Sequence, residues 1–443
     1  MIQGFEGLLV RPQDAEYESG RVLWNRVHEG RPRLIARCAS ELDVARAIRY
    51  AREEGLALSV RSGGHNFAGF SLTDGGLLID ARGLRGVRIE PGRVGLGAGL
   101  RWGDVDAALA PEGLITPGGS VSKVGVAGFS LGTGLGWLGR RHGLTGDNLV
   151  GATVVTAAGE TLRVSAEEHP ELFWALRGGG GGFCVVTEFR ALTHPLPTPV
   201  AGTLIRPLDG SARVLTRLLE VTAAAPATFT WAAVLTCAPP DPALPPSLRG
   251  RPVMLVPVLS TGPDAALVEE VRRVVGAEID TVGPSPFAAF QTASDGAAPE
   301  GLRWDVRSEW LTGLDAAAIE HAVGMAGRLP SPLSNVLFRP LGGAIAAPDA
   351  PDTPFSFRAA GFLVEVIANW AEGEGKAERA WMTEAWEGLR RLSAGGPDVN
   401  HLGVGEDVTR ARTAYSPDAL ARLDAVRAAY DPEGVFPSPL LTP

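Results

Sequence analysis

Apolar positions in the first 190 residues alternate between two patterns, short runs of branched side chains and segments of helical periodicity. Residues 41–55 place Val44, Ala47, Ile48 and Ala51 on one helical face and end at Gly55. We predict strands over 56–60, 76–84 and 93–100, a helix over 101–114, and a hairpin over 148–165 that turns at Ala158–Gly159. A short helix, five consecutive glycines (178–182) and a strand complete this part of the chain.

The spacing changes at residues 193–202, where three prolines predict a domain boundary. Beyond it, longer helical patterns cover 211–226, 264–277, 314–329 and 377–392, with strand patterns over 229–235, 252–259 and 362–370. Helices on one side of a mostly antiparallel sheet, an α+β fold, explain this order most simply. A last helix within 418–436 need not belong to the adjacent domain, because terminal helices often pack against earlier ones.

Composition narrows the class of protein. A chain of 443 residues predicts two domains, and 45% hydrophobic with 21% charged residues is ordinary for a globular protein. The formal charge of −9 argues against nucleic acid as a partner. The three cysteines show no paired spacing, so we expect free thiols and no metal site. With no apolar leader and no run of 18 apolar residues, we expect a cytoplasmic protein without a membrane partner.

Four glycine clusters lie in the first 190 residues, at 63–64, 118–119, 125–139 and 178–182. Glycines let a backbone approach a ligand closely, and successive amides in such turns bind anions. The clusters therefore indicate a large or phosphate-bearing ligand, although flexible loops would explain any single one. The sequence from Gly134 to Gly139 matches the dinucleotide fingerprint G-x-G-x-x-G, but no apolar strand precedes it. We therefore do not interpret it as a nicotinamide-dinucleotide site.

Several motifs together resemble one flavoprotein family. They are SVRSGGHNFAGFS, the glycine-rich stretch from TPGGSVSKVGV to TAAGE, LFWALRGGGGGFCVVTEF, and the closing VNHLG and YDPEGVF. In this order they resemble the FAD-linked oxidases of the berberine bridge enzyme-like group, in the vanillyl-alcohol oxidase superfamily. The similarity is strongest over 55–190 and 398–436.

The resemblance implies a PCMH-type FAD-binding domain of two α+β subdomains, with an inserted antiparallel-sheet substrate domain covered by helices. We expect residues 1–197 and the tail 404–443 to form the FAD-binding domain and 198–403 the substrate domain. It further implies that RSGGH wraps the FAD pyrophosphate and that His65 bonds the flavin 8α carbon; Arg61 adds charge there or forms a structural pair. The expected FAD-binding residues are Arg61, Ser62, Gly63, Gly64, His65, Asn66, Gly69, Pro117, Gly119, Ser120, Val124, Gly125, Gly128, Asn148, Val186 and Asn400.

Two positions depart from, or refine, the family pattern. Many relatives carry a second flavin bond through a cysteine, and Val121 stands at that position here, so we expect His65 to be the single covalent link. Val124 matches a position where a small side chain accompanies oxygen access to the flavin, which favours an oxidase. Packing within a strand explains Val124 equally well.

The proton acceptor is less clear from sequence. Relatives often have Tyr-x-Asn where this chain has Asp398-Val399-Asn400. In an extended segment, residues i and i+2 face the same way, so Asp398 would face the flavin with Asn400 and act as a base or bind a cation. An exposed loop aspartate is the alternative. Glu365, within the strand 362–370, is a second catalytic candidate, and Arg358 and His401 are weaker ones.

These observations predict an FAD-dependent oxidase that removes hydride from a C–H next to an alcohol or amine, or drives oxidative cyclisation. The partners would be a small molecule, such as a bacterial secondary metabolite, and O₂, which becomes H₂O₂; the chain would be a monomer or homodimer. A flavoprotein that sequesters a metabolite with little turnover is the alternative. An NAD-linked dehydrogenase is a third hypothesis. Trp231, Trp304 and Trp310 are expected in the core or lining a pocket.

Overall fold

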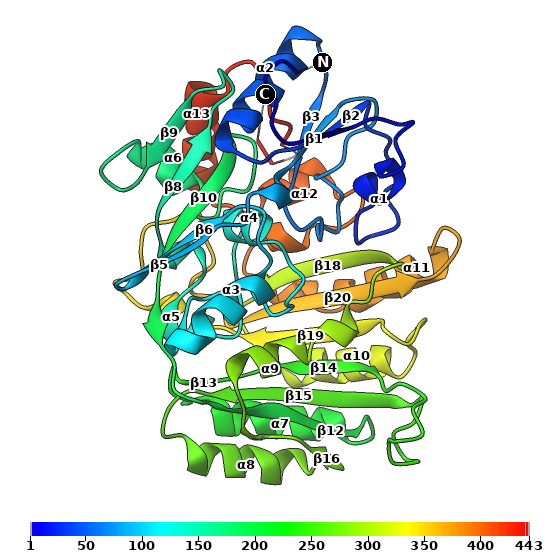
Figure 1. Ribbon diagram of the computed structural model, residues 1–443. Coiled ribbons are helices and arrows are strands. Elements are labelled where there is room, and N and C mark those ends of the chain that lie inside the picture. The colour runs from blue at the N-terminus through cyan, green and yellow to red at the C-terminus, as the bar shows by residue number, and fades with distance from the viewer. Residues whose placement is uncertain (1, 439, 442–443) are drawn as a thin grey trace.

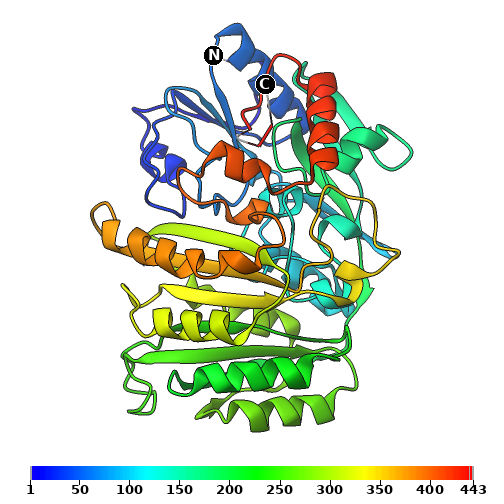
Figure 2. The same ribbon diagram turned by 180° about the vertical axis from the view of Figure 1, so that it is seen from behind.

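The computed structural model describes residues 2–438 and 440–441. Figures 1 and 2 show two layered parts: an upper part that holds both ends of the chain, and a lower part built on one broad sheet with helices behind it. The mixture of sheets and helices confirms the predicted α+β class. The division at 197/198 and 403/404 stays a prediction.

The first sheet of the upper part has four strands in the order β1-β2-β4-β3. Its strands are β1 (Leu8–Val10), β2 (Leu34–Arg37), β3 (Leu58–Arg61) and β4 (Leu77–Asp80). The last three run parallel, and β4 is buried at every position, as expected for a strand covered on both faces. Helix α2 (Glu41–Glu53) packs on it and begins at Ser40, whose side chain caps the Asp43 amide.

The second sheet of the upper part is antiparallel, in the order β5-β6-β10-β8-β9. Its strands are β5 (Val87–Glu90), β6 (Arg93–Gly97), β8 (Leu149–Val155), β9 (Thr161–Val164) and β10 (Val185–Leu192). The predicted hairpin is confirmed in β8 and β9, which turn through Gly159 at φ +76°. The short pair β7 (Leu114–Ile115) and β11 (His194–Pro195) lies beside it. The helices of this part are α1 (Tyr17–Arg21), α3 (Trp102–Leu109), α4 (Val126–Leu131), α5 (Gly139–His142) and α6 (Pro170–Ala175).

The lower sheet is antiparallel and follows the order β16-β12-β15-β14-β19-β20-β18. These strands are β12 (Val200–Pro207), β14 (Ala233–Cys237), β15 (Pro252–Ser260), β16 (Ile279–Asp280), β18 (Arg303–Leu311), β19 (Asn335–Pro340) and β20 (Phe362–Trp370). Two short strands, β13 (Phe229–Trp231) and β17 (Gly283–Pro284), pair with β15 and β12. Strands β12, β18 and β19 were not predicted, and β12 begins inside the segment predicted as a domain boundary, residues 193–202.

Four amphipathic helices cover one face of this lower sheet, as predicted. They are α7 (Ser211–Thr222), α8 (Ala265–Val275), α10 (Ala316–Ala326) and α11 (Lys376–Glu387), seen in front of the sheet in Figure 2. Their apolar sides and the inner residues of the sheet form the largest buried cluster. The opposite face of the sheet is turned toward the upper part, with α9 (Phe287–Thr292) against β12 and α3.

The C-terminal segment returns to the upper part. Helix α12 (Val408–Arg412) is followed by α13 (Pro417–Tyr430), which packs against α6 and buries Leu423 with the core of the antiparallel sheet. Phe436 is buried with residues of α2. Within the described residues, no helix has both the length and the apolar character needed to cross a membrane.

Candidate active site

A cavity of about 520 Å³ lies between the two parts of the molecule. Its wall comes from the RSGGH loop, the 120–137 segment, the glycine loop 180–182, segment 290–298, strands β19 and β20, and residues 399–401. The volume falls within the range of small-molecule sites, about 300–1,000 Å³. Of the predicted site residues, the lining includes Ser62, Gly63, Gly64, His65, Asn66, Ser120, Val124, Gly125, Gly128, Val186, Glu365 and Asn400.

The RSGGH loop leaves the end of β3 and requires its two glycines. A Cβ on Gly63 would lie 2.3 Å from the backbone nitrogen of Gly125, so the two segments meet backbone to backbone. Gly64 has φ +71°, a conformation that side chains rarely adopt. These two constraints direct His65 into the cavity wall.

The His65 ring belongs to a stack of aromatic side chains. It lies 5.0 Å from the Trp24 ring at an interplanar angle of 15°, and Trp24 stacks on Trp304 at 4.9 Å. Burial, together with the charges of Arg101 and Lys123, lowers the pKa of His65 to about 4. The imidazole is therefore neutral at pH 7, which is the form with a nucleophilic nitrogen.

Backbone rather than side chains forms much of the remaining wall. Gly180 and Gly182 have φ values of +77° and +114°, so the glycine loop turns in a way that most residues would strain. A Cβ built on Gly181 or Gly128 meets no atom within 4 Å, although both residues line the cavity. A side chain there would occupy cavity space, so the chain leaves room for a ligand along its backbone. This cradle fits an extended cofactor such as FAD.

Six predicted site residues do not line the cavity: Arg61, Gly69, Pro117, Gly119, Asn148 and Asp398. Arg61 is 1% exposed and donates from Nη2 to Asp80 Oδ2 at 2.9 Å, which is the structural pair considered as its alternative role. Asn148 donates from its side-chain amide to the carbonyls of His142 and Leu144, and its Oδ1 accepts from His194 Nε2 at 2.7 Å. The structure gives these two side chains scaffold contacts.

Gly69, Pro117 and Gly119 act as close-packed backbone behind the cavity. A Cβ on Gly69 would collide with the His28 ring, and one on Gly119 would lie 2.9 Å from Trp102. The carbonyl of Pro117 accepts a hydrogen bond from Thr145 at 2.9 Å. These three residues lie outside the cavity lining, so they would not contact a ligand in it directly.

The expectation that Asp398 and Asn400 face the same way is wrong. Residues Val399–His401 form a 3₁₀ turn rather than an extended segment, and Asp398 caps it by accepting from the Asn400 amide at 3.1 Å. A turn of about three residues rotates neighbours apart, whereas a strand alternates them. Asn400 therefore lines the cavity while Asp398 lies behind it, 1% exposed. Asp398 also accepts from Thr133 Oγ1 at 2.5 Å.

His401 joins the two predicted catalytic carboxylates. Its Nδ1 lies 2.7 Å from Asp398 Oδ2, and its Nε2 lies 2.8 Å from Glu365 Oε1. Arg339 donates from Nε to the other Glu365 oxygen at 3.0 Å and from Nη1 to Ser120 at 3.1 Å. Four ionisable groups thus form one row, Asp398–His401–Glu365–Arg339, along the cavity.

The charges within this row support each other. Burial would lower the pKa of His401, but Glu365 and Asp398 outweigh burial and raise it to about 10. Burial would raise the pKa of Glu365, but His401 and Arg339 reverse this and lower it. At neutral pH His401 is therefore an imidazolium and Glu365 is a carboxylate.

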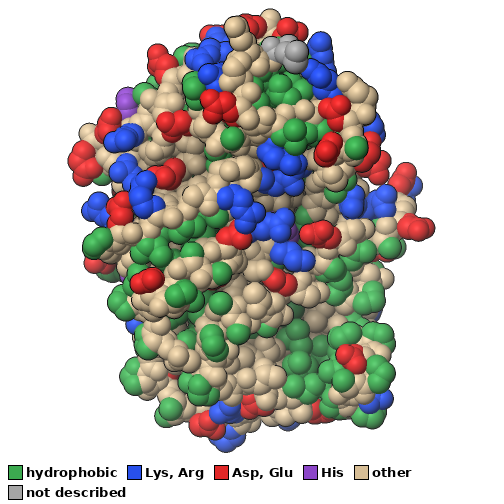
Figure 3. Space-filling model, in the orientation of Figure 1, with side chains coloured by type: hydrophobic (Ala, Val, Ile, Leu, Met, Phe, Trp, Pro, Cys, Tyr) green, Lys and Arg blue, Asp and Glu red, His purple; other side chains and the backbone are tan. Residues whose placement is uncertain are grey.

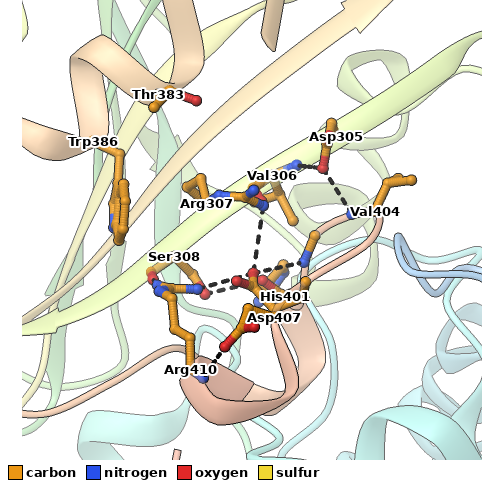
Figure 4. A network of polar contacts seen from close by, with 12 residues as sticks. Asp305, Val306, Arg307, Ser308, Thr383, Trp386, His401, Val404, Asp407 and Arg410 are labelled. Carbon is orange, nitrogen blue, oxygen red and sulfur yellow. Dashed lines mark hydrogen bonds and ion pairs between the residues drawn. The ribbon is translucent and has the colours of Figure 1, made fainter. Parts of the chain in front are cut away.

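Strand β18 and helix α12 clamp the turn that carries His401 (Figure 4). Ser308 Oγ donates to the His401 carbonyl at 3.0 Å and accepts from the Asp398 amide at 3.0 Å. Arg410 donates to the Ser308 carbonyl at 2.6 Å, and Arg307 pairs with Glu406 at 3.4 Å. On the other side, the Gly134 amide donates to Asn400 Oδ1 at 3.0 Å. The turn is therefore fixed to both parts of the molecule.

Sequence reasoning missed Arg339 and Trp24 and ranked His401 low. Arg339 lies on β19 and reaches Glu365 on β20, a pairing that the sequence does not reveal because β19 was not predicted and the register between the two strands depends on tertiary structure. Trp304 lines the cavity, whereas Trp231 and Trp310 are core residues. Arg358 pairs with Asp147 outside the cavity lining. The G-x-G-x-x-G match at residues 134–139 follows helix α4 rather than a strand, which agrees with the interpretation that it is not a nicotinamide-dinucleotide site.

Comparisons with known proteins decide the class of ligand. A family model described as an FAD binding domain matches residues 32–165. The (R)-6-hydroxynicotine oxidase of Paenarthrobacter nicotinovorans is 40% identical over 220 residues, an alignment that covers 48% of this chain and 48% of that one. The crystal structure of 6-hydroxy-D-nicotine oxidase from Arthrobacter nicotinovorans superposes with a TM-score of 0.85 and 27% identity, covering 98% of this chain and 96% of that chain.

The chain therefore contains an FAD binding domain over residues 32–165 and shares its fold with the PCMH-type FAD-binding oxidases. Its structural neighbours include a berberine bridge enzyme-like protein of Arabidopsis thaliana, with a TM-score of 0.85, 21% identity and coverage of 98% of each chain. Another is the glucooligosaccharide oxidase of Acremonium strictum, studied for its 6-S-cysteinyl, 8α-N1-histidyl FAD, with a TM-score of 0.86, 21% identity and coverage of 98% and 96%. These two show the fold. The FAD binding domain and the similarity to FAD-dependent oxidases confirm the predicted resemblance and the predicted enzyme class, an FAD-dependent oxidoreductase.

Proposed function

We propose that this protein is an oxidase of the PCMH-type FAD-binding group, which takes hydride from a small molecule at a C–H next to oxygen or nitrogen and passes the electrons to O₂. The observation that carries the proposal is the shared cavity: the glycine cradle and His65 form one side, and the charged row His401–Glu365–Arg339 forms the other. A cofactor held by the first is within reach of a substrate held by the second.

The glycine loops and the RSGGH turn would hold FAD, with Asn400 near the ring. His65 would form the covalent link, because its neutral ring nitrogen is a competent nucleophile and its ring is fixed against Trp24. Val121 lines the cavity with a hydrocarbon side chain, which offers no sulfur for a second link. Val124, also in the lining, supports oxygen access.

Bound FAD would supply the hydride acceptor and the route to O₂, giving H₂O₂. The chain's own residues orient the substrate and manage charge. Glu365 and Asp398 have their oxygens engaged by His401, Arg339, Thr133 and the Asn400 amide. Both carboxylates therefore act chiefly by holding His401 and Arg339 in place, and a proton reaches Glu365 only if one of these partners moves.

The sheet side of the cavity indicates a compact and mostly apolar substrate. Val234, Leu255, Leu337 and Ile367 present hydrocarbon side chains, and Phe290 and Trp137 add aromatic surface. An oligosaccharide would need many hydrogen-bond partners, whereas the polar residues of the sheet side are limited to Thr203, Asn335, Arg339 and Glu365 in the described lining. A small secondary metabolite, oxidised or cyclised by a cytoplasmic monomer or homodimer, fits the same proposal.

A second candidate is a flavoprotein that sequesters a metabolite with little turnover. The observation that favours it is the engagement of both carboxylates, because the described lining then offers no unpaired carboxylate base. Both candidates bind FAD. The oxidase would reduce the flavin with its substrate and pass the electrons to O₂, whereas the sequestering protein would leave the flavin oxidised.

Anaerobic mixing of the purified yellow protein with a panel of small alcohols and amines tests the proposal. An oxidase bleaches the flavin absorbance near 450 nm with at least one substrate class and then forms H₂O₂ when air is admitted. Tight binding of a compound without bleaching supports sequestration. A colourless protein that gains no colour with added FAD contradicts both.

A further inference from the structure

The charged row presents mainly its cations to the cavity, because Glu365, which also belongs to the lining, is almost fully covered. The side chains of Arg339 and His401 are 19% and 22% exposed, whereas those of Glu365 and Asp398 are 1% exposed each. Each carboxylate lies behind the cation that it pairs with. A molecule in the cavity therefore contacts positive groups whose counter-charges are covered.

Arg339 keeps part of its guanidinium free. Its Nε and Nη1 donate to Glu365 and Ser120, while among the described residues no hydrogen-bond partner takes its Nη2. The guanidinium plane lies near Trp137, with Cζ 5.9 Å from the ring centroid. The two hydrogen bonds and the indole fix the orientation of the free edge, and a planar guanidinium edge suits a carboxylate or another anionic oxygen.

The net charge of the whole chain does not explain this feature. The chain carries a formal charge of −9, and in the view of Figure 3 acidic side chains are spread over the surface while Lys and Arg side chains gather across the middle of the upper half. Arg101 and Lys123 also bring positive charge near His65. Arg101, Lys123, Arg339 and His401 therefore place positive charge beside the cavity, where it would attract an anion.

We propose that the cavity takes substrates whose apolar body carries an anionic oxygen, either a carboxylate or an ionised hydroxyl, which Arg339 binds beside His401. This inference names the substrate class of the proposed oxidase and rests on that function for the reaction, but not for the binding itself. The apolar body lies against Leu255, Phe290 and Trp137. Cationic substrates are disfavoured, because they would meet two exposed cations.

Equilibrium binding of size-matched probes to the purified holoprotein tests this proposal without turnover. Benzoate and 4-nitrophenolate carry the two kinds of anionic oxygen, while benzyl alcohol and benzylamine are the neutral and cationic counterparts. Titration calorimetry at pH 7.5 should show at least one anion binding at least tenfold more tightly than benzyl alcohol and benzylamine. Which anion binds distinguishes a carboxylate from an ionised hydroxyl.

Variants then assign the effect to Arg339. Arg339→Gln should weaken binding of that anion at least tenfold and leave benzyl alcohol unchanged, and Arg339→Lys should restore part of the loss because the charge remains. Arg217→Gln, on the outer surface of α7, is the matched control and should bind like the wild type. Circular dichroism confirms that each variant is folded.

Two results overturn the proposal. One is benzylamine or benzyl alcohol binding as tightly as the anions. The other is an Arg339→Gln variant that binds the anion normally but changes the flavin midpoint potential or loses FAD, because the cations would then serve the cofactor. Failure of the oxidase proposal looks different: anions bind and depend on Arg339, but no compound bleaches the flavin.

Discussion

Asp398 and His401 are held together at 2.7 Å, with the carboxylate on the covered side of the ring and the cavity on the other. Because Asp398 also caps the 3₁₀ turn, the same carboxylate orients the backbone and the imidazole of residue 401. The second ring nitrogen of His401 is then directed at Glu365, and the other oxygen of Glu365 pairs with Arg339. Asp398 is therefore a positioning residue, and its substitution should change the protonation of its neighbour.

This relationship predicts a pH-dependent stability. The pKa of His401 is raised to about 10, so the stability it contributes is fully present below its unfolded pKa, about 6.5, and is lost as the pH rises toward 10. In Asp398→Asn one of the two carboxylates that raise this pKa is gone, so the decline should end at a lower pH and the total loss of stability should be smaller. Urea unfolding at intervals from pH 6 to 10.5 measures it.

The matched control is Asp264→Asn, a buried carboxylate that accepts from Ser260 and Thr228 and lies away from His401. It should lower the free energy of unfolding at every pH without moving the decline. If Asp398→Asn behaves like this control, Asp398 does not govern the charge of His401.

We predict that His65→Ala abolishes covalent flavin. Wild-type protein precipitated with acid should stay yellow and fluoresce in a denaturing gel, because the ring nitrogen of His65 would be bonded to the flavin. The variant should release its colour completely to the supernatant. His28→Ala, at a ring that bonds the Phe67 carbonyl and does not line the cavity, should retain covalent colour. Loss of colour from wild type would contradict the assignment of His65.

Val121 offers a gain-of-function prediction. In the His65→Ala background, Val121→Cys places a thiol in the lining where relatives have a second flavin bond. A fraction of the flavin should become acid-stable again, detectable as a fluorescent band and by intact mass. Val60→Cys in the same background tests a thiol elsewhere in the lining and should give none. Acid-stable flavin in neither double variant would mean that Val121 does not face the ring.

Gly181 and Gly283 offer a matched test of whether the glycine loop 180–182 contacts FAD. Neither has a positive φ, and a Cβ on either meets nothing within 4 Å, but only Gly181 lines the cavity. Both alanine variants should keep the wild-type midpoint of unfolding when measured without FAD. Gly181→Ala should take up FAD at least about tenfold more weakly, a cost of about 1.4 kcal/mol, whereas Gly283→Ala should load normally. Equal loading would place FAD away from this loop.

Arg61 is predicted to stabilise the fold rather than bind FAD. Its side chain and that of Asp80 are 1% and 0% exposed, so Arg61→Met should cost about 3–5 kcal/mol, as expected when one partner of a buried ion pair is removed. Arg82→Gln removes a more exposed partner of the same carboxylate and should cost at most about 1 kcal/mol. Chemical denaturation gives both values. A normal flavin-to-protein ratio in folded Arg61→Met is expected, and a lowered ratio would return Arg61 to the cofactor site.

Local patterns predicted much of the fold because the forces involved are local. The apolar face of 41–55 gave α2, and the turn at Gly159 gave the β8–β9 hairpin. Strands β18 and β19 escaped prediction because polar residues such as Asp305, Ser308 and Arg339 interrupt their apolar pattern. Ser308 holds the turn of His401, and Arg339 belongs to the charged row. The polar residues that obscured the two strands in the sequence are therefore residues of the candidate site.

The sequence by itself determined that glycine-rich turns surround His65, because backbone conformations such as that of Gly64 depend on residue type alone. It also determined that Val121 supplies no thiol. Only the tertiary structure decided that Asp398 turns away from the cavity and that His401 bridges it to Glu365. The reason is physical: ionisation and exposure depend on which charges meet across strands and turns, and Arg339 meets Glu365 only after β19 pairs with β20.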